Sequence, residues 1–185
     1  MTGPNASATQ AERLYDELLV TLTQAGDRAA ANRLAARWQP RLARTARRLL
    51  GDREAALGAV QDSWVAILRG IGGLRNPARF APWAFGILHR HCVDRIRRNQ
   101  ARRGREDELE SEPRATGGAV DEALAIRQAF AALATDQRIA AHLFFVEGLT
   151  LAEIAEVQEV PLGTAKSRLF HARRQLKAAL SGDVP

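Results

Sequence analysis

The stretch from Glu147 to Leu176 constrains the fold of this chain more than any other, because it holds two helical patterns separated by a forced turn. Thr150 and Glu153 have the spacing of a capping box, in which the hydroxyl and the carboxylate each satisfy a backbone amide at a helix start. This helix must end near Val157, because Pro161 forces an extended backbone on the residue before it. A second helix is predicted to begin at about Pro161. Two short helices joined in this way are typical of a helix-turn-helix.

The second predicted helix has two chemically distinct faces. Small and aliphatic side chains recur at steps of four, three, four and four, and this stripe should face the core: Ala165, Leu169, Ala172, Leu176 and Leu180. The opposite face carries cations around one aromatic ring: Lys166, Phe170, Arg173, Arg174 and Lys177. Charge runs on helices commonly contact only water, but an exposed phenylalanine among cations is better explained by a partner. This arrangement suits a DNA groove.

Composition agrees with a helical protein that binds a polyanion. The chain of 185 residues is 46% hydrophobic but only 5% aromatic, which favours packed helices over sheets. Its formal net charge of +6 suggests nucleic acid as the partner. No apolar run approaches the roughly 20 residues needed to cross a bilayer, and the N-terminus lacks a secretory pattern. We therefore expect a cytoplasmic protein without membrane insertion, in which the single cysteine, Cys92, fills the core.

Helical spacing of apolar residues continues through the first half of the chain. Residues 1–26 are set apart as an N-terminal extension whose latter part could form a short amphipathic helix. Three stripes predict the next three helices: Leu34 to Leu49, Ala56 to Ile71, and Phe85 to Ile96. Pro40 is expected to kink or divide the first of these helices. Gly51-Asp52 and Gly72-Gly73 are the predicted helix boundaries, and Pro82 suits a first turn.

An acidic segment separates this part from the helix-turn-helix. Residues 106–122 contain seven carboxylates against the single cation Arg114, with Pro113 and Gly117-Gly118 among them, and this composition predicts a flexible linker. Two further helical patterns, the second from Asp136 to Val146, lead into the capping box. The predicted fold is therefore all-α, with two small helical domains at residues 27–105 and 123–182, the second containing the helix-turn-helix.

The sequence resembles the extracytoplasmic-function sigma factors, the small two-domain promoter-recognition subunits of bacterial RNA polymerase. The most specific matches are Glu147-Gly148-Leu149-Thr150, Glu153-Ile154-Ala155, Val160-Pro161 and Lys166-Ser167-Arg168-Leu169. In the N-terminal part, Val60-Gln61 and Trp64 look like the polymerase-docking helix of the family. Trp83, Ile87, Asp94 and Arg97 look like its promoter-opening helix. The sequence departs from the family pattern at Gly58, Ala84, Arg90, Thr135 and Glu159.

The resemblance implies a protein that directs promoter-specific transcription initiation and has no cofactor. Its partners would be the β′ clamp helices and β flap of core RNA polymerase, promoter DNA and an anti-sigma protein. Polymerase docking would use Val60, Gln61, Asp62 and Trp64. The melted minus-ten strand would contact Arg75, Asn76, Arg79, Phe80, Trp83 and Arg90, whose rings and cations suit unstacked bases. The minus-thirty-five duplex would contact Thr164, Lys166, Ser167, Arg168, Phe170, His171, Arg173 and Arg174.

Other interpretations of these residues remain open at this point. A dimeric helix-turn-helix repressor or activator on a palindromic site would explain the C-terminal half, but it would leave the helices of Trp64 and Trp83 without a task. Phe80 and Trp83 could equally be core residues. The arginines between residues 41 and 48 could be a solvated face or lie along nucleic acid or an acidic polymerase surface. His89, His91 and Cys92 do not have zinc-like spacing, and no nucleophile and base arrangement indicates an enzyme.

Overall fold

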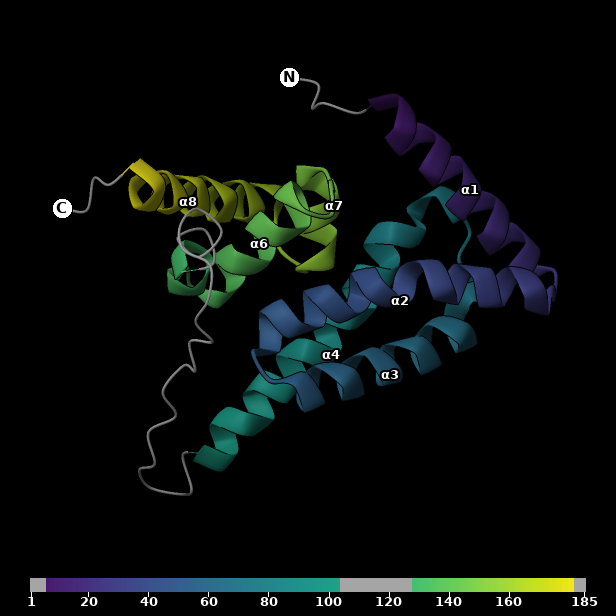
Figure 1. Ribbon diagram of the computed structural model, residues 1–185, viewed down its shortest axis with the longest axis horizontal. Coiled ribbons are helices and arrows are strands. Elements are labelled where there is room, and N and C mark those ends of the chain that lie inside the picture. Colours follow the sequence, from purple (N-terminus) through teal and green to yellow (C-terminus); the bar gives the residue numbers. More distant parts are fainter. Residues whose placement is uncertain (1–5, 104–127, 182–185) are drawn as a thin grey trace, which may run out of the picture. The chain divides into compact units, whose positions relative to one another are not determined.

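The computed structural model describes residues 6–103 and 128–181, and its contacts divide the chain into two compact units, residues 1–95 and 96–185. The first unit runs from purple to teal in Figure 1, and the helices of the second are green and yellow. The predicted acidic linker at residues 106–122 lies outside the described residues.

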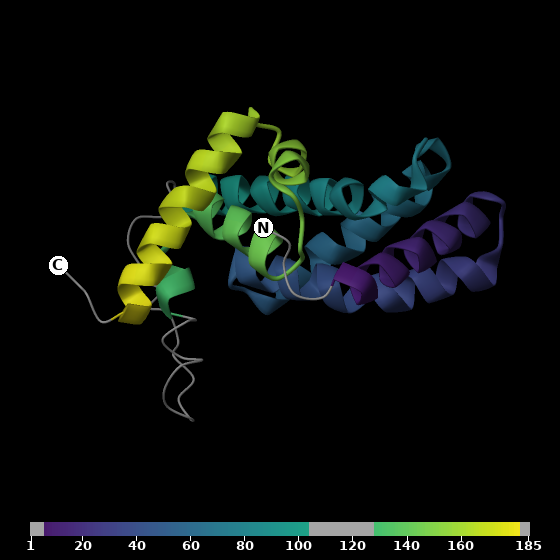
Figure 2. The same cartoon turned by 90° about the horizontal axis from the view of Figure 1, so that it is seen from above.

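Helices make up the first unit. Its elements are α1 (Ala6–Gln24), α2 (Arg28–Leu50), α3 (Arg53–Gly70), the short 3₁₀ helices η1 (Ile71–Gly73) and η2 (Pro77–Arg79), and α4 (Phe80–Arg103), which extends past the division at residue 95. Figure 2 shows α1 and α2 folded back on each other as a helical hairpin.

Local sequence signals fix where these helices begin and end. Asp27 caps α2 by accepting hydrogen bonds from the backbone N–H of Ala29 and Ala30, at 2.8 and 3.1 Å. Gly51 ends α2 with φ of 69°, a left-handed conformation that a side chain disfavours. Asp52 then caps α3 through the N–H of Ala55 at 2.6 Å. The predicted boundary at Gly51-Asp52 is confirmed, whereas α2 continues through Pro40 and is not divided by it.

Aromatic rings on α2 and α4 centre the core of the first unit. Trp38 is fully buried and meets Phe80 and Phe85 edge-on, with ring centroids 5.0 and 5.7 Å apart. The guanidinium of Arg41 lies over the same Trp38 ring at 4.1 Å. Cys92 is buried as expected, and this burial raises the pKa of its thiol to about 12.

α1 is an integral part of the first unit. Leu19 and Val20 are buried, and Asp16 accepts a hydrogen bond from Nε of Arg37 on α2 at 2.6 Å. The Gln24 side-chain amide donates to the carbonyls of Ile71 and Leu74, both at 2.8 Å. The later part of the segment that the sequence set apart as an extension, from Asp16 to Gln24, is therefore packed on the helices that follow it.

The second unit is built around its last helix. Residues 128–132 are helical, followed by α6 (Thr135–Phe145), α7 (Leu151–Val157) and α8 (Leu162–Ser181). The helix predicted from Asp136 to Val146 is thus confirmed. The core of the unit joins α8 to the earlier helices through Ala129, Leu133, Ala141, Leu169, Ala172 and Leu176.

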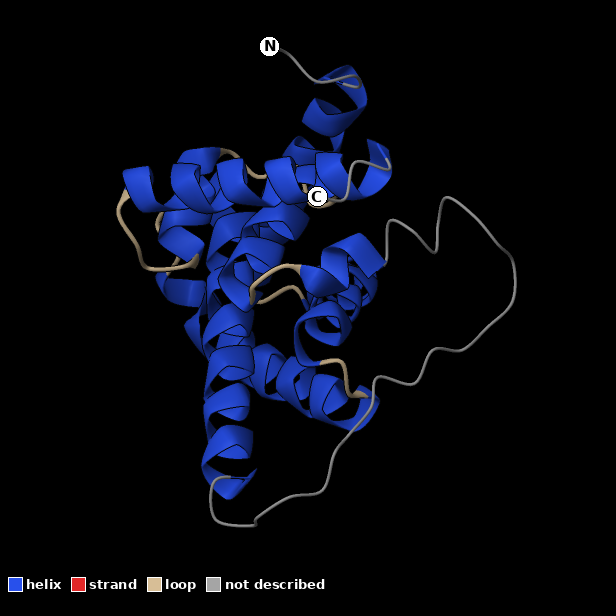
Figure 3. Cartoon of the chain, turned by 90° about the vertical axis from the view of Figure 1, so that its left-hand side faces the viewer, coloured by secondary structure: helices blue, strands red, loops and turns tan. Residues whose placement is uncertain are grey.

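The all-α prediction is confirmed. Figure 3 shows helices and loops, and the described residues contain no strand. No helix in residues 6–103 and 128–181 is long and apolar enough to cross a membrane.

Candidate nucleic-acid interface

The turn between α7 and α8 has the predicted geometry. Oγ1 of Thr150 accepts a hydrogen bond from the N–H of Glu153 at 3.3 Å, and the Glu153 carboxylate accepts one from the N–H of Thr150 at 2.7 Å. Glu159 has φ of 53° and is the one residue other than glycine with a positive φ among those described. Its left-handed backbone reverses the chain before Pro161, so the capping box sets the start of α7 and the strained turn leads into α8.

One face of α8 is buried and the other is exposed, as the periodicity predicts. Ala165, Leu169, Ala172 and Leu176 are in the core. The side chain of Leu180, the last member of the predicted stripe, is not among those that the structure describes. Phe170 is 61% exposed, and its ring centroid is 5.7 Å from that of His171. Burying this exposed ring against a partner would remove apolar surface from water and would therefore stabilise the complex.

Most of the predicted duplex contacts surround Phe170 on this exposed face. They are Thr164, Lys166, Ser167, His171, Arg173 and Arg174, and Lys177 extends the cationic surface toward the C-terminus. Ser167 donates its hydroxyl hydrogen to the Gly163 carbonyl at 3.0 Å, within the helix. The face therefore offers cations for phosphates, and polar and aromatic groups for base edges.

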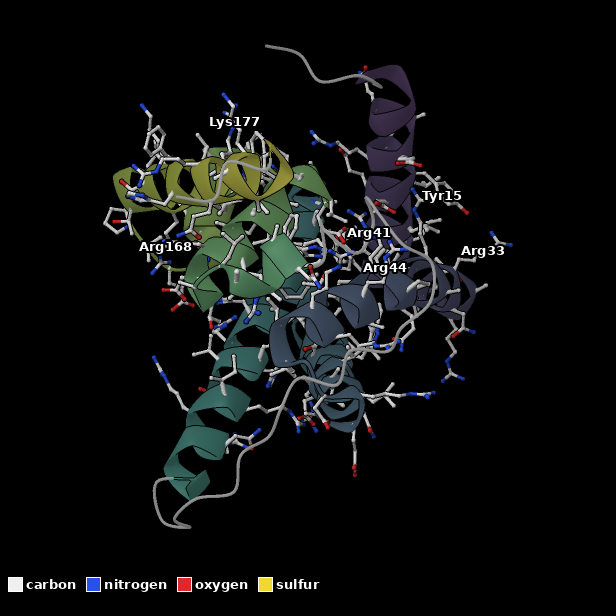
Figure 4. The ribbon with its side chains drawn as sticks, turned by 60° about the vertical axis from the view of Figure 1, so that its left-hand side comes forward. Tyr15, Arg33, Arg41, Arg44, Arg168 and Lys177 are labelled. Carbon is white, nitrogen blue, oxygen red and sulfur yellow. The ribbon has the colours of Figure 1, made fainter. Side chains whose placement is uncertain are left out.

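Arg168 has a different place from the other predicted duplex contacts. Its guanidinium donates to the Asp136 carboxylate at 2.5 Å and to Oε1 of Gln158 at 3.2 Å. The Gln158 amide in turn donates to the Asp136 backbone carbonyl at 2.9 Å. Figure 4 shows Arg168 and Lys177 extending from opposite sides of α8. Arg168 thus ties α8 to the start of α6 and the end of α7, and we propose that it positions α8, whereas the sequence predicts a DNA contact for it.

The predicted minus-ten residues divide into an exposed loop and buried supports. Arg75 and Arg90 are exposed, and Asn76 is exposed while its side chain accepts a hydrogen bond from the Ala78 N–H at 3.0 Å. Arg79 is half-buried. Cations and a rigid loop are therefore at the surface.

Phe80 is not available for stacking on a base. Its side chain is 1% exposed, because the first turn of α4 directs it inward against Trp38. Trp83 is half-buried, 6.0 Å from the Phe80 ring, and its ring lies so close to Gly70 that a Cβ there would be 3.1 Å away. The expectation that Phe80 stacks on an unpaired base is wrong for this conformation, and the core interpretation of that ring holds.

The four predicted docking residues on α3 differ in exposure and in their contacts. Val60 is buried, and Asp62 faces α4, where Nη2 of Arg95 donates to its carboxylate at 2.7 Å. The same guanidinium lies over Gly58, where a Cβ would be 2.7 Å from it. The remaining two residues stay at the surface: Gln61 is exposed, and Trp64 is half-buried and donates its indole N–H to Gln39 at 2.5 Å.

Sequence reasoning missed two exposed leucines beside Gln61 and Trp64. Leu57 and Leu68 are 53% and 54% exposed, and the four residues follow one another at steps of four, three and four on α3. We call this the outer α3 stripe. Its helical spacing was visible in the sequence, but the neighbouring stripe from Ala56 to Ile71 packs in the core through Ala56, Val60, Ile67 and Ile71, while its remaining member, Trp64, is half-buried.

A second exposed apolar group lies at the end of α6. Phe144, Phe145 and Val146 are 36%, 50% and 45% exposed, and the two rings are 5.1 Å apart. The flanking residues are buried: Nε2 of His142 lies 3.6 Å from the Glu147 carboxylate. Exposed neighbouring rings of this kind are typical of a protein contact.

Comparison with known proteins gives the same two-part division. The family description Sigma-70 region 2 matches residues 34–102, and Sigma-70, region 4 matches residues 123–176. The ECF RNA polymerase sigma factor SigM of Mycobacterium tuberculosis (strain H37Rv) is 33% identical over 169 residues, which are 91% of this chain and 86% of that protein. The ECF RNA polymerase sigma-E factor of Escherichia coli (strain K12) is 29% identical over 184 residues, covering 89% and 94%.

Solved structures share the fold. The sigma factor RpoE from Bartonella quintana, in complex with the anti-sigma factor NepR, aligns with a TM-score of 0.69 and 24% identity, over 83% of this chain and 98% of that one. CnrH, in complex with the cytosolic domain of CnrY, aligns with a TM-score of 0.65 and 23% identity, over 92% and 99%.

Proposed function

The chain belongs to the extracytoplasmic-function sigma factors, which direct promoter-specific transcription initiation by RNA polymerase, and from this premise we propose that four of its surfaces bind promoter DNA and core polymerase. The interpretation as a dimeric repressor or activator is not favoured, because both halves of the chain match sigma-factor domains. The domain limits that we propose are residues 27–105 and 123–182, with α1 added to the first.

The exposed face of α8 reads the minus-thirty-five duplex. The observation that carries this assignment is the 61% exposure of Phe170 between Lys166 and Arg173 on the second helix of a helix-turn-helix whose first helix starts with a capping box. A major groove admits such a helix, and its base edges offer acceptors for Lys166 and an apolar thymine methyl for the phenylalanine ring. Arg173 and Arg174 then contact phosphates, which fix the register of the helix.

The outer α3 stripe binds the β′ clamp helices of core polymerase. Leu57, Gln61, Trp64 and Leu68 form an apolar row with polar interruptions, which fits the helix-to-helix packing expected of a helical partner. Phe144, Phe145 and Val146 on the second unit are the surface we assign to the β flap, because they are its exposed aromatic group apart from Phe170 and His171 within the described residues.

The loop at residues 71–79 holds the melted minus-ten strand. Arg75, Asn76 and Arg90 supply exposed cationic and amide groups, and the half-buried Trp83 supplies the aromatic edge. Phe80 supports this loop from below through its contact with Trp38. We propose that the chain itself catalyses no reaction, that it acts in the cytoplasm with core polymerase, and that an anti-sigma protein binds it, as NepR binds the sigma factor of Bartonella quintana.

Reconstitution with core polymerase tests this function. The chain and core polymerase together should co-elute in gel filtration and start transcription at a cognate promoter, and neither should do so alone. Genomic fragments selected by the reconstituted enzyme would supply that promoter. A folded chain that fails to bind core polymerase at low salt would overturn the proposal.

A further inference from the structure

The face of α2 beside α1 carries a row of cations that is not part of the four surfaces assigned above. The 23 residues of α2 include arginine at positions 28, 33, 37, 41, 44, 47 and 48 and no aspartate or glutamate. Five of these arginines follow one another at steps of four, four, three and four, so they share one side of the helix: Arg33, Arg37, Arg41, Arg44 and Arg48. We call them the α2 arginine row. It rises by about 22 Å, the length of roughly six stacked nucleotides.

An exposed aromatic ring lies beside this row. Tyr15 on α1 is 43% exposed, and the guanidinium carbon of Arg37 is 5.7 Å from its ring centroid. Arg37 is held there by Asp16, whose carboxylate accepts its Nε hydrogen at 2.6 Å. Figure 4 shows Tyr15 and Arg33 projecting to the same side of the first unit, with Arg41 and Arg44 farther along α2.

Two arginines of the α2 arginine row are held in place by neighbouring side chains. Arg37 is clamped between a carboxylate and a ring, and Arg41 is stacked over Trp38 at 4.1 Å, so two members are ordered before any ligand arrives. Arg33, Arg44 and Arg48 are exposed. Prior ordering lowers the entropy lost on binding, and planar guanidinium groups suit phosphate oxygens.

We propose that Tyr15 and the α2 arginine row form a second DNA surface that binds single-stranded DNA. The inference rests on the proposed function, because initiation supplies melted strands beyond the minus-ten element. A base stacks on the exposed ring of Tyr15, with Arg37 beside the same ring, and the strand continues along Arg33, Arg44 and Arg48.

Two other occupants explain less of this surface. A DNA duplex presents phosphates and base edges but no free base faces, so it would give Tyr15 no role. An acidic protein surface would likewise use the arginines and leave the ring unexplained. Single-stranded DNA uses both, since every unstacked base has a face for the ring and a phosphate for the row.

A photocrosslinking experiment on the full chain locates the contact. The probe is an oligothymidylate of about 12 nucleotides containing 5-iododeoxyuridine, and mass spectrometry identifies the crosslinked residue. We expect crosslinking at Tyr15 that Tyr15→Phe keeps and Tyr15→Leu removes, because both variants retain bulk but only phenylalanine retains the ring. Tyr15→Leu should also weaken binding to the oligonucleotide by about five-fold or more, without changing binding of an equally long duplex.

The salt dependence tests the arginine row. Arg33→Gln with Arg44→Gln should make the slope of log affinity against log salt about 1.4 units shallower, since each single-strand phosphate contact contributes about 0.7. The matched control is Arg53→Gln with Arg69→Gln, two exposed arginines of α3 with the same charge change, and this pair should leave the slope unchanged.

Three outcomes would overturn the proposal: no crosslink at Tyr15, equal loss in the row and control pairs, or loss of core polymerase binding with oligonucleotide binding intact. The last result would assign the row to an acidic protein surface. The wild-type chain is tested for core polymerase binding in parallel, so failure of the sigma-factor function is seen separately from failure of this surface.

Discussion

Glu159 occupies the position on which the α7–α8 turn depends. A φ of 53° brings Cβ close to the following carbonyl and costs about 1 to 2 kcal/mol for a residue with a side chain. Neighbouring contacts maintain the conformation: the Val160 N–H donates to the Ala155 carbonyl at 3.0 Å, and the Glu159 N–H donates to the Glu156 carbonyl at 3.1 Å. The turn is therefore strained at one residue, Glu159, and this strained backbone lets the chain reverse direction before α8.

Relief of this strain should be measurable. Glu159→Gly removes the Cβ, whereas the control Glu159→Ala removes the same polar groups and keeps the Cβ. We expect the glycine variant to be about 1 kcal/mol more stable than the alanine variant in urea unfolding of the second unit. Equal stabilities would mean that the left-handed backbone imposes no cost here.

Phe170 and Arg174 should differ in the kind of DNA binding that each supports. Phe170→Ala removes an apolar contact to bases and should lower discrimination between cognate and altered minus-thirty-five duplexes by about 1 to 3 kcal/mol. Arg174→Gln removes a phosphate contact, so it should weaken all duplexes alike and reduce the salt slope by about 0.9. Fluorescence anisotropy over a salt series distinguishes the two. Unchanged promoter preference in Phe170→Ala would remove α8 from base recognition.

Between elements, Arg168 joins three parts of the second unit. Its bonds to Asp136 and Gln158 link α8 to the start of α6 and the end of α7. The Asp136 side chain is 53% exposed, so water screens the ion pair, and we expect the whole cluster to contribute only about 1 kcal/mol of stability. We propose that its larger effect is to fix the orientation of α8 relative to α6 and α7.

Asp136→Ala distinguishes a positioning cluster from a DNA contact. If Arg168 contacted phosphate, loss of its carboxylate partner would free a cation and strengthen duplex binding. Because we assign Arg168 to positioning, we expect Asp136→Ala and Arg168→Ala to weaken cognate binding by similar factors, and the double variant to be little worse than either. Stronger binding by Asp136→Ala would restore Arg168 to the DNA interface.

The exposed leucines of the outer α3 stripe should contribute to core polymerase binding. Leu57→Ser or Leu68→Ser should weaken core polymerase binding about ten-fold or more, because each leucine loses roughly 1.5 kcal/mol or more of buried apolar contact in the complex. Both side chains are more than half exposed, so the variants should melt like the parent chain. Leu18→Ser on α1, at 52% exposure, is the matched control and should bind normally. Normal binding by both stripe variants would place the docking surface elsewhere.

The features that could be predicted from the sequence are those that depend on residues close together in the chain. The capping box at Thr150, the stop at Gly51 and the stripe from Ala165 to Leu176 depend on spacing along one helix, so the sequence suffices for them. The orientations of Phe80 and Arg168 depend on partners far away in sequence, Trp38 and Asp136. No periodicity within α4 or α8 contains that information.

The same reasoning applies to the docking helix. Val60 and Leu57 are both apolar residues on α3, but Val60 is buried where α3 packs in the core of the first unit, and Leu57 is exposed. Asp62 was assigned to polymerase, but it pairs with Arg95, whose guanidinium lies over Gly58. A family resemblance locates the helix that acts, whereas the fold decides which of its side chains are exposed.

In the whole molecule, we expect different surfaces to depend on different hydrophobic cores, because each of the two units has its own core. Trp38, Phe80 and Phe85 close the first unit, and Ile154, Leu169 and Ala172 belong to the second. The outer α3 stripe and the loop at residues 71–79, for which we propose polymerase and minus-ten contacts, lie on the first core, and the exposed face of α8 lies on the second. Each task should therefore depend on the integrity of one core.

Core variants can separate the two tasks in the intact chain. Trp38→Ala removes a fully buried indole and should cost the first unit about 3 to 5 kcal/mol, a large share of the stability of a small domain. Ile154→Ala, also fully buried, should cost the second unit about 2 to 5 kcal/mol. At a temperature between the melting points of variant and parent, Trp38→Ala should lose core polymerase binding and keep minus-thirty-five duplex binding. Ile154→Ala should lose duplex binding and any contact made by Phe144, Phe145 and Val146, but it should keep the polymerase contact made by the outer α3 stripe, because its damage is confined to the core that holds α8. Gel filtration with core polymerase and anisotropy with duplex, measured on the same samples, check both halves, and loss of both activities in either variant would show that the two cores are one cooperative system.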